Sequence, residues 1–305
     1  MSASEALKHG DYKELQGTTG KTNYIFNEYS KKVTVVLPDG SKTEYDMLGY
    51  ANGNKKAYLV IGPGAMGVYA MLGHLKTIED RLSDVQEISG ASAGSILAVM
   101  LALGKSIDEV IDISLKLNIS DLVKVDLKCF LYRYGFVNVE SMRDTFVRIC
   151  GCDPTFSELK KKIYISAFCV NTKQTEYFSV DTHPDMKVLD AMLMSIAIPF
   201  VFSAIKFNGN TYVDGGMMES LPMAPFLDKK PHDVYCVELK YRLKYTESID
   251  DIHTFAQTII RSSFQNRYEY DMSRYELKTV DVGDMDIFDF DMCYEDKIRM
   301  YMKGT

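Results

Sequence analysis

The sequence predicts an α/β protein with a central, mostly parallel sheet flanked by helices. Two observations carry this prediction: segments typical of strands alternate with segments typical of helices, and two of the strands run directly into glycine-containing turns that open a helix. The chain has 305 residues, of which 46% are hydrophobic, so it can bury a substantial core. We expect an N-terminal β extension over residues 1–56, a core over 57–226 and a C-terminal part over 227–305.

The two outer parts are less regular than the core. Residues 32–45 alternate apolar and polar side chains around Pro38-Asp39-Gly40, which predicts a β-hairpin in the N-terminal extension. In the C-terminal part, residues 234–239 read as a last strand and residues 252–273 as a helix, followed by an acidic stretch over 281–296. The C-terminal part is therefore expected to be one final strand and a helical, acidic extension.

The core opens with a strand, a glycine-rich loop and a helix. Residues 56–61 form the strand, Gly62-Pro63-Gly64-Ala65-Met66-Gly67 the loop, and residues 68–75 the start of the helix. The first amides of a helix lack internal partners, so such a loop can hold a phosphate or a developing oxyanion. The same spacing also fits the dinucleotide-binding fingerprint, with Glu87 as the acid that would bind a ribose.

A second strand-to-helix turn contains a serine between small residues. Residues 85–88 read as a strand and residues 95–103 as an apolar helix, and Gly90-Ala91-Ser92-Ala93-Gly94 joins them. This G-x-S-x-G pattern is typical of a nucleophile elbow, which exposes a serine hydroxyl on a sharp turn. Side chains at the two glycines would clash with that turn. The alternative is a small-residue loop before a buried helix, without a catalytic role.

The middle of the chain continues the alternation of helices and strands. Residues 107–117 and 139–149 are expected to be helical, whereas residues 162–170 and 176–180 are expected to be paired strands. The aromatic segment 130–136 allows two interpretations, a membrane-facing segment or a loop that joins two helices. We favour the loop.

An aspartate followed by two glycines ends a later strand. Asp214-Gly215-Gly216 comes after an apolar segment and the turn at Asn208-Gly209-Asn210, which places Asp214 at the tip of a strand. On its own, this tripeptide is most often only a turn. Its position after an oxyanion-type loop and an elbow is what makes Asp214 a candidate for catalysis.

Taken together and in this order, the three motifs resemble the patatin-like phospholipase family over residues 57–225. Residues 191–202 and Leu221-Pro222 extend the likeness. The resemblance implies a three-layer fold and a lipid acyl hydrolase that acts without a cofactor on a phospholipid or another fatty-acyl ester, in transient contact with a membrane surface. It implies Ser92 as nucleophile and Asp214 as its base. The motif residues that it implies are Gly62, Gly64, Ala65 and Gly67 in the oxyanion loop, Gly90 and Gly94 in the elbow, and Gly215 and Gly216 after the aspartate.

Two positions depart from the family's pattern. Pro63 stands where a glycine is common, and it has no amide hydrogen to donate. The resemblance then leaves the amides of Gly64 and Ala65 as oxyanion donors, with Met66 nearby. Met66 replaces the basic residue that usually precedes the last glycine, so a positive charge near the oxyanion is missing from the loop.

A serine–histidine–aspartate triad is the alternative to a serine–aspartate dyad. Only His232 and His253 follow Asp214, and neither lies in a recognisable motif. A carboxylate in a dry pocket is a stronger base than in water, so the dyad needs no histidine.

Composition limits the other possibilities. The net charge of −7 argues against nucleic acid as a partner. The six cysteines are irregularly spaced, with Cys150 and Cys152 too close for a zinc or redox motif, so we expect neither metal nor disulfides. The polar start and the short apolar runs predict no signal peptide and no transmembrane segment. We expect a soluble protein, cytoplasmic or peripheral at membranes.

Two rival functions use the same fold. One is a catalytically silent module that binds lipid or nucleotide, and the other is an acyltransferase that passes the acyl group to an alcohol instead of water. The presence of both Ser92 and Asp214 argues against the silent module, whereas Pro63 and Met66 leave it open. The acyltransferase would use the same residues as the hydrolase.

Overall fold

The computed structural model describes residues 14–19, 22–27, 32–36, 39–46, 56–119, 122, 125–264, 267 and 269–305. The chain divides into two compact units, residues 1–55 and residues 56–305. The smaller unit contains an antiparallel sheet in the order β1-β2-β3-β4. Its strands are β1 (Glu14–Thr19), β2 (Thr22–Asn27), β3 (Lys32–Val36) and β4 (Lys42–Asp46). The hairpin expected around Asp39-Gly40 corresponds to the pair β3–β4, and β1 and β2 add to it.

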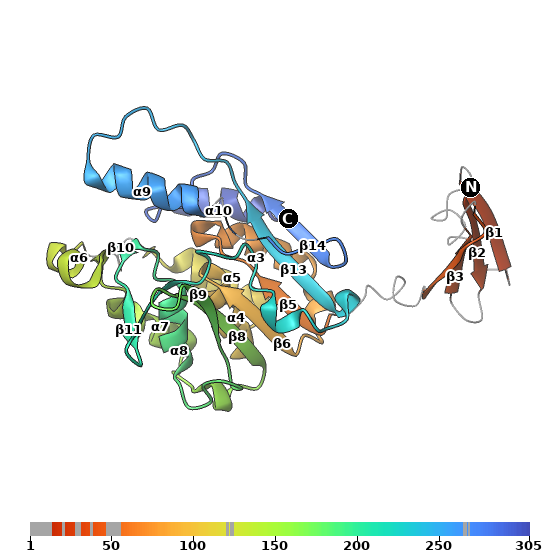
Figure 1. Cartoon of the computed structure of the whole chain (residues 1–305), viewed down its shortest axis with the longest axis horizontal. Coiled ribbons are helices and arrows are strands. Elements are labelled where there is room, and N and C mark those ends of the chain that lie inside the picture. Colours follow the sequence, from red (N-terminus) through yellow and green to blue (C-terminus); the bar gives the residue numbers. More distant parts are fainter. Residues whose placement is uncertain are drawn as a thin grey trace. The chain divides into compact units, whose positions relative to one another are not determined.

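The larger unit is built on a sheet in the order β11-β12-β8-β6-β5-β13-β14, with β9 also paired to β8 (Figure 1). The contacts β8–β6, β6–β5, β5–β13 and β13–β14 are parallel, whereas β9, β12 and β11 are added antiparallel. The strands are β5 (Tyr58–Ile61), β6 (Glu87–Ala91), β8 (Lys162–Cys169), β9 (Gln174–Phe178), β11 (Ile205–Phe207), β12 (Asn210–Asp214), β13 (Val234–Lys240) and β14 (Glu276–Asp281).

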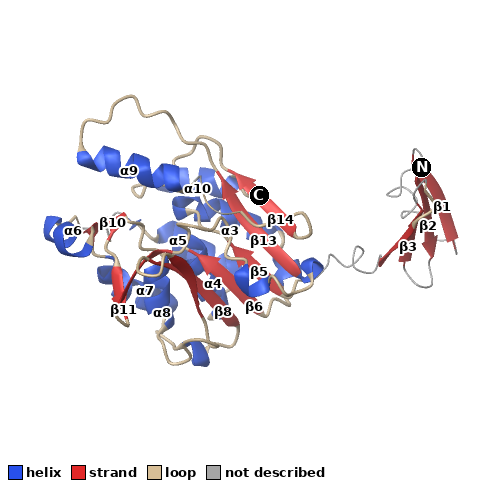
Figure 2. Cartoon of the chain, viewed as in Figure 1, coloured by secondary structure: helices blue, strands red, loops and turns tan. Residues whose placement is uncertain are grey.

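Helices surround this sheet, as Figure 2 shows, and a separate short parallel pair joins β7 to β10. The central, mostly parallel sheet with flanking helices that the sequence predicts is thereby confirmed. The remaining elements are α3 (Val68–Thr77), α4 (Ala93–Ala102), α5 (Ile107–Lys116), α6 (Leu127–Arg133), β7 (Gly135–Val137), α7 (Arg143–Cys150), α8 (Val188–Ser195), β10 (Phe200–Phe202), α9 (Ile252–Ser263) and α10 (Tyr294–Met302).

Strand β5 shows how the sheet divides the interior into two cores. Successive side chains of a strand point to opposite faces. Leu59 and Ile61 belong to the larger core, which also contains the buried side chains of α3, α4 and α8. Val60 belongs to a smaller core on the other face, with Phe226 and Cys236. The glycine loop and the elbow therefore extend from strands that are buried on both sides.

Strand β8 aligns the two strands that end in the candidate site residues. Its first half pairs with β6, where Ala91 lies opposite Ser166, and its second half pairs with β12, where Asp214 lies opposite Ala167. Strand β9 pairs with one edge of β8, along residues that include part of the β6 pairing and all of the β12 pairing. Strands β6 and β12 must therefore both lie along the opposite edge of β8. The two strands approach each other head to head, so their C-terminal ends meet.

Two expectations about secondary structure were wrong. The helix expected over residues 252–273 ends at Ser263, and a further strand, β14, follows β13 in the sheet. Strand β14 lies at the edge, and only Leu277 and Val280 are not exposed, so its pattern does not resemble that of the buried strands. The aromatic segment 130–136 is not a loop, because it forms the end of α6 and the start of β7.

Among the described residues, no helix is both long and apolar enough to cross a bilayer.

Candidate active site

Ser92 lies on a sharp turn between β6 and α4. Its backbone has φ 52° and ψ −128°, in the left-handed region that a residue with a side chain rarely adopts. Three hydrogen bonds fix the turn. The Ser92 N–H donates to Ser195 Oγ at 2.9 Å, and the Ser95 hydroxyl and amide both donate to the Ser92 carbonyl oxygen, at 2.6 and 2.9 Å. The turn therefore has the geometry of the predicted nucleophile elbow.

The elbow glycines sit where the backbone of the turn is crowded. A Cβ atom on Gly90 would lie 2.6 Å from the carbonyl oxygen of Gly94, and one on Gly94 would overlap the carbonyl oxygen of Ile61. Real Cβ atoms essentially never approach a backbone atom so closely. Glycine at both positions lets α4 pack directly on β5 and β6.

Asp214, at the end of β12, is the hydrogen-bond partner of Ser92. The Ser92 hydroxyl donates to Asp214 Oδ2 at 2.6 Å, and the N–H of Gly216 donates to Asp214 Oδ1 at 2.7 Å. The Asp214 N–H donates to the carbonyl oxygen of Ala197, and the Gly215 N–H donates to that of Ser195. Both carboxylate oxygens and the backbone beside them are thus held in place.

The Asp214 carboxyl is completely buried, and burial changes its acidity. Desolvation raises the pKa of Asp214 to about 7, because an apolar environment disfavours the charged form. The hydrogen bonds from Ser92 and Gly216 and the positive charge of Arg267 oppose this shift of the pKa. A carboxyl group with a pKa near neutrality can both accept and return a proton at physiological pH.

The glycine-rich loop leaves two amides without a partner. The Gly62 N–H donates to the carbonyl oxygen of Val237, and the Met66 N–H donates to that of Ile287. The amides of Gly64 and Ala65 find no acceptor among the residues that the structure describes. These two amides of the loop can therefore donate hydrogen bonds to a ligand oxygen, whereas the Met66 amide is already engaged.

Pro63 has a packing role that the sequence did not indicate. A Cβ atom on Gly216 would lie 2.6 Å from Pro63 Cβ. The proline ring therefore rests directly on the backbone that follows Asp214. This contact links the glycine loop to the loop that holds the aspartate.

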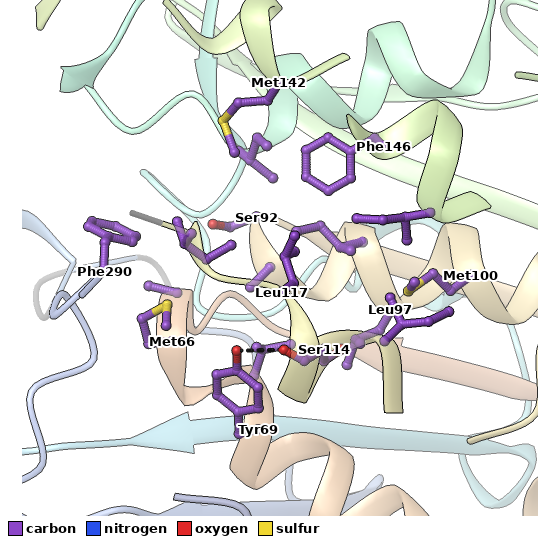
Figure 3. Close-up of a pocket in the computed structure, with 18 of the residues that line it drawn as sticks. Met66, Tyr69, Ser92, Leu97, Met100, Ser114, Leu117, Met142, Phe146 and Phe290 are labelled. Atoms are coloured by element: carbon purple, nitrogen blue, oxygen red, sulfur yellow. Dashed lines mark hydrogen bonds between the residues drawn. The ribbon is translucent and has the colours of Figure 1, made fainter. Parts of the chain in front are cut away.

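Two cavities meet at Ser92. The first, of about 100 Å³, is almost entirely apolar and is bounded by side chains such as Met66, Leu97, Phe146 and Phe290 (Figure 3). Its polar exceptions include Tyr69, whose hydroxyl donates to the carbonyl oxygen of Ser114 at 3.0 Å.

The second cavity is far smaller, about 10 Å³, and Gly64, Ala65 and Ser92 line it together with Tyr241 and Arg267. The candidate nucleophile and the two free amides therefore border one space.

Two histidines follow Asp214 in the sequence and are the candidates for a triad. His232 lies in a short 3₁₀ turn over Pro231–Asp233, with its side chain exposed and near Asp233, and it borders neither cavity. His253 lies in α9, but its side chain is outside the described part of the structure.

Three residues near the site were missed by the sequence analysis. Ser195 binds the elbow amide, and Tyr241 and Arg267 line the smaller cavity. Ser195 lies within a segment that carried the family resemblance, but nothing there marked its hydroxyl. Tyr241 and Arg267 lie in segments without any motif. In the part of the chain that is described, no group of three or more histidine, cysteine or acidic side chains is arranged to hold a metal ion.

The fold and the site together define an α/β protein in which a serine on a sharp strand-to-helix turn is hydrogen-bonded to a buried aspartate. The profile described as Patatin-like phospholipase matches residues 59–227. The chain belongs to the patatin-like phospholipase family.

Individual comparisons agree with this assignment. An uncharacterized protein of Acanthamoeba polyphaga mimivirus is 31% identical over 229 residues, covering 68% of this chain and 76% of the relative. A probable lipid hydrolase of Invertebrate iridescent virus 6 is 26% identical over 225 residues, covering 70% and 73%. Among solved structures, VipD from Legionella pneumophila has a TM-score of 0.60 at 15% identity, covering 100% of this chain and 71% of that one, and so shares the fold.

Because the Asp214 carboxyl is buried, we expect the stability of the folded protein to depend on pH. Because the pKa of Asp214 is raised from 3.8 to about 7 by folding, the folded state holds its proton more tightly than the unfolded state. The free energy of unfolding should therefore fall as pH rises from about 4 to about 7. Asp214→Asn stays neutral, so we expect it to be more stable than the wild type at pH 8 by about 2–4 kcal/mol, and equally stable near pH 4.

Urea unfolding at a series of pH values measures this difference. Asp144→Asn, at an exposed position of α7, is the control for the general effect of replacing an aspartate by asparagine. A constant difference between Asp214→Asn and the wild type from pH 4 to pH 8 would show that Asp214 is not held protonated by burial.

Proposed function

We propose that this protein hydrolyses fatty-acyl esters of phospholipids or lysophospholipids through an acyl-enzyme on Ser92, with Asp214 as the base. The observation that carries the proposal is the 2.6 Å hydrogen bond from the Ser92 hydroxyl to the buried Asp214 carboxylate, at the wall of an apolar cavity. Membership of a lipid-hydrolysing family and the likeness to a probable lipid hydrolase support it.

In the first half of the reaction, Asp214 Oδ2 takes the proton of the Ser92 hydroxyl as Oγ attacks the ester carbonyl carbon. The carbonyl oxygen becomes an oxyanion, which the free amides of Gly64 and Ala65 stabilise. When the intermediate collapses, the carbon–oxygen bond to the alcohol breaks, and Asp214 gives its proton to the leaving oxygen. The lysolipid or other alcohol departs, and the acyl group stays on Ser92.

In the second half, water replaces the alcohol. Asp214 takes a proton from water as the water oxygen attacks the acyl carbon. The second tetrahedral intermediate then releases the fatty acid and returns the proton to Ser92 Oγ. The apolar cavity that opens at Ser92 suits the hydrocarbon part of an acyl group throughout, because its walls offer almost no polar contacts.

We expect Ser92→Ala to abolish both ester hydrolysis and covalent labelling by a fluorophosphonate probe, because it removes the attacking oxygen. Asp214→Asn should lower turnover between about a hundredfold and ten-thousandfold, because an amide cannot take the serine proton. Turnover on phospholipid and lysophospholipid, read by mass spectrometry, and gel fluorescence of the labelled chain measure these effects.

His232→Ala is the matched control and should leave turnover within about twofold of the wild type, since an exposed histidine outside both cavities has no part in proton transfer. A large loss of turnover in His232→Ala would favour a serine–histidine–aspartate triad. Labelling that persists in Ser92→Ala would place the nucleophile elsewhere, and a wild-type chain without labelling or hydrolysis would favour a silent lipid-binding module.

The pH profile follows from the same carboxyl. Only deprotonated Asp214 can accept the serine proton, so kcat/KM on a soluble ester should rise with pH, reach half its plateau near pH 7, and lie about a hundredfold lower at pH 5. Stopped-flow measurement of acylation with p-nitrophenyl butyrate gives this profile directly. Acylation that is flat between pH 5 and pH 8, or that falls with rising pH, would exclude Asp214 as the base.

We also propose that the enzyme meets its substrate at a lipid surface through α6 and α9. Figure 1 shows these helices near β10 at one end of the larger unit. They border a groove of about 340 Å³, and Phe290 lines both this groove and the apolar cavity at Ser92. The groove and the cavity at Ser92 therefore share one wall residue. The exposed large apolar side chains of these two helices are Leu127, Leu131, Tyr132, Ile252, Phe255 and Ile259.

Charges placed on this face should separate lipid binding from chemistry. We expect the double variant Leu131→Glu, Phe255→Glu to lower turnover on phosphatidylcholine vesicles, relative to turnover on p-nitrophenyl butyrate, by at least about tenfold, because two large apolar contacts with lipid are lost. Met302→Glu, exposed on α10 and outside the groove, is the control. An unchanged ratio in the double variant would show that lipid does not bind at this face.

A further inference from the structure

The smaller cavity at Ser92 has room for a single oxygen atom. Its volume is about 10 Å³, close to the least space that can hold one water molecule. Gly64 and Ala65 line it, and the amides of these two residues have no acceptor among the described residues. The oxyanion of a tetrahedral intermediate is a single oxygen and fits this space.

Tyr241 brings an unused hydroxyl group to this cavity. It lies one residue beyond the end of β13, and its ring packs edge-to-face on Phe288. Its hydroxyl oxygen is buried and has no hydrogen-bond partner among the residues that the structure describes. A buried hydroxyl without a partner is costly, so this group is expected to meet a ligand atom. Burial raises the pKa of Tyr241, which keeps the phenol protonated and able to donate.

Arg267 brings a cation to the same cavity. Its guanidinium lies over the ring of Phe264, 5.7 Å from the ring centroid, and donates to the carbonyl oxygen of Gly216 at 3.4 Å. That is a long hydrogen bond, and it is the single one that the guanidinium forms within the described residues. An arginine has five N–H donors, so this one bond to a described residue uses little of its donor capacity.

We propose that the side chains of Tyr241 and Arg267 complete the oxyanion site, donating hydrogen bonds to the same oxygen to which the amides of Gly64 and Ala65 donate. The inference rests on the proposed hydrolase function and extends it to two residues outside the 59–227 family match. The remaining walls include Ile198 and Phe288, so the developing negative charge would face fixed donors in an otherwise apolar space. The positive charge that the glycine loop lacks comes from the C-terminal part of the chain.

Tyr241→Phe tests the hydroxyl with the smallest possible change. We expect kcat on p-nitrophenyl butyrate to fall at least about tenfold, towards the hundred- to thousandfold loss typical of a deleted oxyanion donor, with KM within about threefold. The melting temperature should stay the same or rise, because an unpaired buried hydroxyl has been removed. Tyr235→Phe is the control: that hydroxyl is buried but paired with His74 at 2.7 Å, so its loss should lower the melting temperature and leave kcat unchanged.

Arg267→Met tests the cation. We expect a comparable loss of kcat, partial recovery in Arg267→Lys, and partial rescue of Arg267→Ala by added guanidinium ion, since a merely structural role would not respond to the free ion. Arg81→Met is the control, because Arg81 also lies over an aromatic ring, that of Tyr235 at 5.2 Å, but outside the cavity. It should keep the wild-type kcat.

Three results would overturn the inference while the wild type remains active and labelled on Ser92. The first is a kcat within about twofold of the wild type in both Tyr241→Phe and Arg267→Met. The second is a loss on phosphatidylcholine without a loss on p-nitrophenyl butyrate, which would make the two side chains a headgroup site. The third is a melting temperature that falls in Tyr241→Phe as it does in Tyr235→Phe. A wild type without hydrolysis or labelling would instead overturn the proposed function, and this inference with it.

Discussion

The candidate site depends on one constraint: β6 and β12 each pair with β8, along the same edge of that strand. The strands arrive from opposite directions and stop at consecutive residues of β8, Ser166 and Ala167. A slip of two residues in either register would move a side chain by about 7 Å, and a slip of one would turn it to the other face of the sheet. The short hydrogen bond between Ser92 and Asp214 is therefore a product of strand register, with no histidine needed to span a gap.

Register alone brings the groups together, and the surroundings set their chemistry. Desolvation of Asp214 opposes ionisation, and two hydrogen bonds and one nearby cation favour it, so the pKa of the carboxyl comes to lie near neutrality. The left-handed backbone of Ser92 costs free energy, which the hydrogen bonds to Ser195 and Ser95 help to offset. The backbone around Ser92 is too crowded for a side chain at Gly90 or Gly94. The ring of Pro63 likewise leaves no room for a side chain at Gly216.

The sequence predicted the parts of the molecule that local chemistry dictates. Strands that are buried on both faces give continuous apolar runs, and the turns after them need glycine, so the glycine loop, the elbow and Asp214-Gly215-Gly216 were recognisable. Strand β14 was not, because an edge strand with charged, exposed positions has no apolar run to detect. Tyr241 and Arg267 were missed for another reason. A side chain that reaches a site from a distant segment carries no local pattern, and only the packing of β13 and the segment after α9 brings those two residues to the cavity.

The walls around Ser92 have a consequence for how the protein is made. The elbow and Asp214 lie within the first 214 residues of the sequence, whereas Tyr241, Arg267 and Ile287, whose carbonyl oxygen accepts from the Met66 amide, come later. A chain growing on the ribosome therefore carries the serine and its aspartate before it has the segments that enclose them. The cavities at Ser92 are enclosed only when β13, β14 and the segments beside them pack against the rest of the sheet. Under the proposed function, reactivity towards lipid would then be delayed until synthesis is nearly complete.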